Sequence, residues 1–154
     1  MLVFIDTEFT NFATPELISL GMVGELGEEC YIEVPFVTAR CSDFVRDVVI
    51  PQFGNDPHAF CEKADLRVRI LKWLQIIKRA DPIQICYDSE YDWRLFVQAL
   101  EGHVPDWIEP CWIKSTEINE LLLYAYFKEH PDEREHHALT DARANRFAYR
   151  PRKR

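Results

Sequence analysis

The chain opens on Met1-Leu-Val-Phe-Ile-Asp-Thr-Glu-Phe-Thr10, an apolar stretch that runs into two carboxylates. Its branched and aromatic residues predict a buried β-strand over residues 2–6. Side chains two positions apart on a strand point to the same face, so Asp6 and Glu8 can converge on one cation. A solvated acidic pair at a strand end is the alternative, because 26 of the 154 residues are Asp or Glu.

A second candidate site segment lies near the other end of the chain, in His136-His-Ala-Leu-Thr-Asp141. The residues that follow have helical spacing of apolar side chains and predict a helix over residues 138–149. Asp141 would then hold a metal from the first turn, and His136, on the segment before it, would take a proton from water. His137 is the alternative base, because it would share a helix face with Asp141. The other alternative is that His136, His137 and Asp141 only form a polar start of the helix and take no part in a reaction.

Both stretches resemble motifs of the DEDDh 3′–5′ exonucleases. Asp6-x-Glu8 is similar to the first motif of that family, and His136-x-Ala138-x-x-Asp141 matches its H-x-A-x-x-D motif. The motifs occur in the family's order and spread over almost the whole chain. In length the chain is most similar to the compact stand-alone exoribonucleases of the oligoribonuclease and ribonuclease T type.

The middle motif of that family is an Asp preceded by an aromatic residue and followed by an apolar pair. Glu90-Tyr-Asp-Trp-Arg-Leu-Phe96 resembles it and makes Asp92 the fourth acidic residue. The family often carries Asn or a small residue four positions earlier, where this chain has Asp88. An apolar run over residues 82–87 precedes Asp88, which could therefore face the metals instead of Asp92. Asp92 is favoured because it alone has the flanking pattern.

The order of predicted elements indicates an α/β fold with a mixed central sheet flanked by helices. Besides the first strand, strands are expected over residues 17–25, 29–34, 83–87 and, less regularly, 111–114. Helices are expected over residues 42–49, 62–79, 91–100, 115–130 and 138–149. No linker or repeat divides residues 1–154, so a single exonuclease domain is expected. The family resemblance names the architecture as a ribonuclease H-like fold.

Composition excludes several other classes of protein. The longest apolar runs fall short of the roughly 18 residues of a membrane span, and no basic region precedes the first strand, so a cytoplasmic protein without a membrane segment is expected. Five cysteines without a C-x-x-C pair indicate neither a disulfide framework nor a zinc ribbon. Five glycines supply no phosphate-binding loop, and no G-x-S-x-G motif is present.

The formal net charge of −8 at first opposes a nucleic-acid partner. Bound metal ions would supply part of the missing positive charge, and a third of the 18 basic residues cluster beside the Asp141 helix. These six residues are Arg143, Arg146, Arg150, Arg152, Lys153 and Arg154. They could meet phosphates, although a flexible basic tail is the alternative for the last four residues.

The resemblance implies a metal-dependent 3′–5′ exoribonuclease that releases nucleoside monophosphates from single-stranded RNA or 3′ overhangs. The implied ligands of two Mg²⁺ or Mn²⁺ ions, about 3.5–4 Å apart, are Asp6, Glu8, Asp92 and Asp141. His136, which has the motif spacing, is the implied general base. The resemblance favours RNA over DNA as the partner, and an exodeoxyribonuclease of the same family is the alternative. It is also compatible with a homodimer.

Residues next to the metal carboxylates are expected to contact the substrate. They are Thr7, Phe9, Thr10 and Phe12, whose aromatic members can stack on a terminal base. A haloacid dehalogenase-type phosphatase is the more distant alternative, because Asp6-Thr-Glu-Phe-Thr10 is similar to the Asp-x-Asp-x-Thr of that class. The chain lacks the later G-D-x-x-x-D motif of such enzymes, which disfavours the phosphatase.

Overall fold

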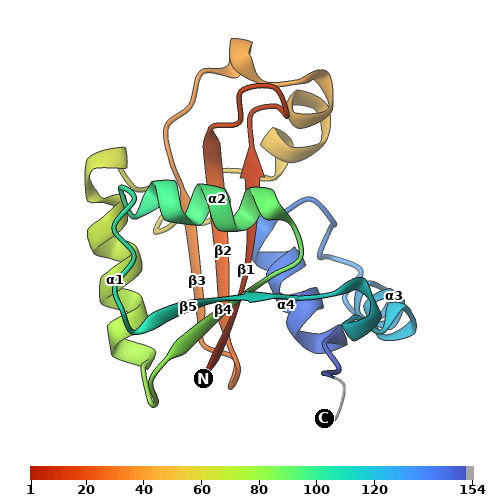
Figure 1. Cartoon of the computed structure of the whole chain (residues 1–154). Helices are drawn as coiled ribbons and strands as arrows, with labels where there is room; N and C mark the ends of the chain where they lie inside the picture. The colour runs from red at the N-terminus through yellow and green to blue at the C-terminus, as the bar shows by residue number, and fades with distance from the viewer. Residues whose placement is uncertain (152–154) are drawn as a thin grey trace.

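A five-stranded mixed sheet forms the centre of the molecule, with strand order β3-β2-β1-β4-β5 (Figure 1). The computed structural model describes residues 1–151. The strands are β1 (Leu2–Phe9), β2 (Leu17–Gly24), β3 (Glu29–Glu33), β4 (Ile83–Tyr87) and β5 (Ile108–Trp112). The first three strands pair antiparallel, whereas β1, β4 and β5 pair parallel. The predicted α/β architecture with a mixed, helix-flanked sheet is therefore confirmed.

Helices cover both faces of the sheet (Figure 1). They are α1 (Leu66–Ile77), α2 (Glu90–Ala99), α3 (Glu120–Glu129) and α4 (Ala138–Ala148). Val3 and Ile5 of β1 belong to the main core, which α1 and α2 help to build. Phe4 belongs to a second cluster on the opposite face, with Cys86 and Ile113. Because side chains alternate along a strand, Asp6 and Glu8 project on the Phe4 side, where α4 packs.

A glycine in β2 lets α4 approach this face closely. A Cβ atom at Gly21 would lie 2.2 Å from the carbonyl oxygen of Ala138, the first residue of α4. No side chain fits in that space, so only glycine allows the N-terminus of α4 to rest on the sheet. This contact brings the first turn of α4 beside the end of β1.

Several element boundaries differ from the sequence-based expectation. β1 continues to Phe9, and β5 begins at Ile108, earlier than expected, because Ile108 fills the core and pairs with Ile83. The helix expected over residues 115–130 is interrupted. Its α-helical part begins after Asn119, whose side chain accepts hydrogen bonds from the backbone of Leu121 and Leu122.

The two other differences concern shorter helical turns. Residues expected to form an α-helix over 42–49 form a π-helical turn, Val45–Val49, followed by a 3₁₀ turn, Ile50–Gln52, that contains Pro51. The helix expected over 62–79 starts with a 3₁₀ turn, Lys63–Asp65, before α1. A further 3₁₀ turn is Thr38–Arg40, and Ser115–Glu117 precedes α3. None of the helices within residues 1–151 has the length and apolar character needed to cross a bilayer.

Candidate metal centre

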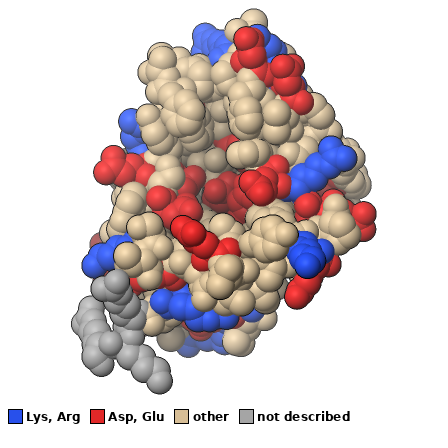
Figure 2. Space-filling view, turned by 90° about the vertical axis from the view of Figure 1, so that its right-hand side faces the viewer, with Lys and Arg blue, Asp and Glu red and all other residues tan. Residues whose placement is uncertain are grey.

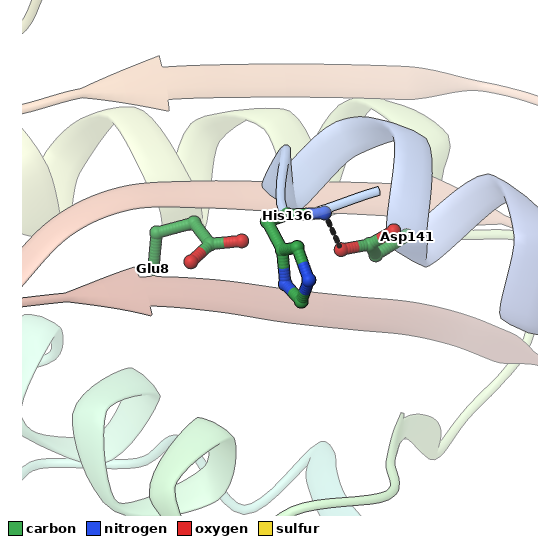
Figure 3. A group of neighbouring side chains, drawn as sticks. All are labelled: Glu8, His136 and Asp141. Atoms are coloured by element: carbon green, nitrogen blue, oxygen red, sulfur yellow. Dashed lines mark hydrogen bonds between the residues drawn. The ribbon is translucent and has the colours of Figure 1, made fainter. Parts of the chain in front are cut away.

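Acidic side chains from both halves of the chain meet at the end of β1. Asp6, Asp88 and Asp92 offer carboxylate oxygens that lie within 4.8 Å of one another. Glu8, His136 and Asp141 form a second group within the same limit (Figure 3). Figure 2 shows acidic side chains gathered in a hollow on this face of the molecule, with Lys and Arg to its right and toward the edges of the view.

Asp92 is the most buried carboxylate of the cluster, at 2 % exposure. It lies in the first turn of α2, which Ser89 caps by accepting a hydrogen bond from the Tyr91 backbone. The backbone N–H and the hydroxyl of Thr7 both donate to its Oδ1, at 3.0 and 2.6 Å. Its Oδ2 is buried and has no hydrogen-bond partner among the described residues. An orphaned buried carboxylate oxygen that faces other carboxylates fits a cation ligand.

The structure places Asp88 in the cluster together with Asp92. Asp88 follows β4 directly, and its Oδ2 accepts a hydrogen bond of 3.2 Å from the side-chain amide of Asn145. Five carboxylates therefore gather where the sequence motifs assigned four. Asn145 was not singled out from the sequence, although it stands four residues after Asp141 and so on the same face of α4.

The two adjacent histidines point to different places. His136 adopts a left-handed backbone conformation with φ of 62°, and its N–H donates to Oδ2 of Asp141 at 2.8 Å. Its ring packs edge-on against Phe44, with centroids 4.8 Å apart, and lies beside Glu8 (Figure 3). The His137 ring instead packs on Tyr31, and burial lowers its pKa. His136 is thus the histidine that faces the carboxylates.

Crowding and burial favour the protonated form of these acids. Burial, followed by repulsion from the neighbouring carboxylates, raises the pKa of Asp6 well above its ordinary value. The same causes raise the pKa of Glu8 from 4.5 to about 8. Burial also raises the pKa values of Asp92 and Asp141 to about 7. A bound divalent cation would reverse this preference, because it stabilises the ionised carboxylates.

Two pockets adjoin the acidic cluster. The first, called the aromatic pocket, has a volume of about 340 Å³. Besides the acids, Thr7, Phe9, Phe12 and Phe44 line it, so three of the four residues expected at the substrate lie there. The second, called the α3 pocket, has a volume of about 410 Å³ and lies against α3 and α4. Asp6, His136 and Asp141 line both pockets.

Thr10 does not line either of these pockets. Its side chain is fully buried, and its hydroxyl donates to the carbonyl of Thr14 and accepts from the N–H of Glu16. The residue thus holds the loop after β1 in place. Its hydroxyl is used inside the protein, and the expected direct contact of Thr10 with substrate stays a prediction.

The basic residues near the C-terminus are largely engaged with the protein itself. Arg143 forms ion pairs with Glu29 and Glu133, and Arg146 donates to the carbonyl of Glu25. Arg150 likewise donates to backbone carbonyls. The remaining members of the expected basic tail, Arg152, Lys153 and Arg154, lie outside the described residues. Two carboxylates therefore offset the charge of Arg143, whereas the carbonyl oxygens bound by Arg146 and Arg150 orient these side chains without cancelling their charge.

Comparison of the chain with protein-family models and with curated proteins found no match. Its function is therefore inferred from the geometry and chemistry of the acidic cluster.

The raised pKa values predict opposite effects of pH on the metal-free and the metal-bound protein. Between about pH 4 and pH 8 the metal-free folded protein binds more protons at Glu8, Asp92 and Asp141 than the unfolded chain does. Its melting temperature should therefore fall as pH rises from about 4 to about 8 and level off above that. Mg²⁺ or Mn²⁺ should raise the free energy of unfolding, and this gain should grow over the same pH interval. At a metal concentration of about one hundred times the dissociation constant, the gain is about 2.7 kcal/mol.

Calorimetric melting with chelator or with metal, at about pH 5.5 and about pH 8.5, measures both trends. Glu8→Gln is the matched variant, because it removes the group whose pKa is raised to about 8. It should raise the metal-free melting temperature at the higher pH and reduce the gain from metal. A metal effect that is absent or independent of pH would contradict a cation site at this cluster.

Proposed function

We propose that this protein is a metal-dependent 3′–5′ exoribonuclease that hydrolyses the terminal phosphodiester of single-stranded RNA and releases nucleoside monophosphates. The observation that carries the proposal is the pair of adjacent side-chain groups that could hold a metal ion, Asp6–Asp88–Asp92 and Glu8–His136–Asp141. Two sets of hard oxygen donors with one imidazole beside them suit two-metal hydrolysis of a phosphate ester. The resemblance of the three sequence motifs to the DEDDh exonucleases supplies the 3′ polarity.

The residues fit two Mg²⁺ or Mn²⁺ ions held by Asp6, Glu8, Asp92 and Asp141. When bound, such ions lower the pKa of a coordinated water and neutralise charge on the phosphate. Thr7 orients Asp92 through two hydrogen bonds to one oxygen, which leaves the other oxygen free for a ligand. The protein thereby fixes its most buried ligand before any ion binds.

His136 has the position of a general base in this proposal. Its ring lies beside Glu8, and its backbone is tied to Asp141. Both pockets meet at this ring, so it can reach a water attacking a phosphate placed between them. Removal of that proton by the imidazole nitrogen leaves a hydroxide that forms the new P–O bond, while the bond from phosphorus to the 3′ oxygen of the upstream nucleoside breaks and that oxygen takes up a proton from the imidazolium or from water.

The sheet topology and the pockets support the same proposal. The order β3-β2-β1-β4-β5, antiparallel on one side and parallel on the other, is compatible with a ribonuclease H-like fold. The aromatic pocket places Phe9 and Phe12 beside the acids, where a terminal base can stack.

A time course on 5′-labelled RNA and DNA of the same sequence tests the proposal. With Mg²⁺ or Mn²⁺ we expect a ladder that shortens from the 3′ end, faster on RNA than on DNA, and no cleavage with chelator. An RNA that carries a 3′-terminal phosphate is a useful control, because it alters only the end that is attacked. Internal cleavage, or release of inorganic phosphate from small phosphate monoesters without shortening of RNA, would refute the exonuclease.

A further inference from the structure

The acidic cluster lies at the junction of two pockets, and the proposed function assigns a base to the aromatic pocket only. The α3 pocket shares Asp6, His136 and Asp141 with the aromatic pocket and extends from them toward α3. A phosphodiester held at the shared acids therefore has a pocket on each side. Such an arrangement suits two consecutive nucleosides, one in each pocket.

The wall of the α3 pocket contains an aromatic ring that packing does not explain. Leu123, Tyr124 and Phe127 line the pocket from one face of α3. Tyr124 is 70 % exposed, and among the described residues its ring pairs with no other aromatic ring. The neighbouring Tyr126, in contrast, is buried against Phe127, His130 and Phe147.

The charge of this pocket indicates what it can bind. Five carboxylates line it, and within the described part of the chain no Lys or Arg does. These acids are Asp6, Asp88, Glu120, Glu135 and Asp141. Away from bound metal, such a surface repels phosphates, so it cannot hold a strand through its backbone. An uncharged base that stacks on an exposed ring avoids that repulsion.

We propose that the α3 pocket binds the nucleoside on the 5′ side of the scissile phosphodiester, with its base stacked on Tyr124; this inference rests on the proposed function. The aromatic pocket then receives the 3′-terminal nucleoside. We assign this orientation because three phenylalanines, Phe9, Phe12 and Phe44, line the aromatic pocket from the end of β1, the loop after it and the turn at residues 42–45. Exposed Tyr124 and Glu120 form the edge of the α3 pocket, from which a strand can continue into solvent.

The test compares two substrates that differ only on the 5′ side of the cleaved bond. A short RNA fills both pockets, whereas the p-nitrophenyl ester of uridine 5′-monophosphate carries the terminal nucleotide with nitrophenol in place of the upstream nucleoside. Tyr124→Ala should lower kcat/KM for the RNA about ten- to a hundredfold, mainly through KM, and leave ester hydrolysis unchanged. Tyr124→Phe, which keeps the ring, should be close to normal on both.

Leu121→Ala is the matched control, because Leu121 is 80 % exposed on the same helix and does not line the pocket. Leu121→Ala should leave kcat/KM unchanged for both substrates. Melting curves show whether each variant is folded. Normal ester hydrolysis with an unchanged RNA rate in Tyr124→Ala would overturn the upstream site and leave the nuclease in place. Equal losses on both substrates would also overturn it, since the ring would then act on the terminal nucleotide or the metals. A wild-type protein that hydrolyses neither substrate with metal would refute the proposed function itself.

Discussion

Asp6→Asn should abolish hydrolysis, with a loss of at least about a thousandfold, and leave the protein folded. Asp6 lines both pockets and contributes an oxygen to the group formed with Asp88 and Asp92. The amide has nearly the same shape as the carboxylate, so the packing of β1 is kept. Removing one charge from a crowded, buried set should raise the metal-free melting temperature near pH 8. Steady-state rates on labelled RNA, paired with melting curves, measure both effects.

Asp92→Asn and Asp88→Asn test separately the contributions of two acids near the start of α2. Asp88 precedes this helix, and Asp92 lies in its first turn. Asp92→Asn should be as inactive as Asp6→Asn, because it removes the oxygen that is buried without a partner. Asp88→Asn should keep most activity, since Asp88 is exposed and already shares a hydrogen bond with Asn145. The reverse result would make Asp88 the metal ligand and show that the middle motif is misaligned. Retention of more than about a tenth of the rate in Asp6→Asn would defeat the assignment of the whole cluster.

His136→Ala should lower kcat about 10²- to 10⁴-fold, the usual contribution of a general base. His136→Asn is the better matched variant, because asparagine tolerates the φ of 62° at this position. Both should retain the rise in melting temperature with Mn²⁺ if the imidazole moves a proton and does not bind the ion. Single-turnover rates and metal-dependent melting together distinguish the two roles.

His137→Ala provides the control for the neighbouring histidine. Its ring packs on Tyr31 on the far side of the segment, so its loss should reduce stability modestly and leave kcat near normal. Loss of activity in His137→Ala, with His136→Ala near normal, would assign the base to His137. Loss of the metal effect in His136→Ala would make His136 a ligand.

Much of the site could be predicted from local sequence pattern, because the relevant geometry is local. Alternation along β1 places Asp6 and Glu8 on one face wherever the strand lies. Helical spacing after residue 137 places Asp141 in the first turn of α4. The order of strands and helices likewise indicated the mixed, helix-flanked sheet. Each of these inferences depends on residues within a few positions of one another.

Only the tertiary structure decided how these local pieces meet. The choice between His136 and His137 depends on a left-handed residue held by the Asp141 carboxylate, which no periodicity reveals. Asp88 enters the cluster because the chain turns between β4 and α2 toward Asn145 on α4. The sequence by itself therefore determined which residues share a strand face or a helix turn. Long-range packing, such as the contact between the N-terminus of α4 and Gly21, determined which faces meet and therefore where the two pockets open.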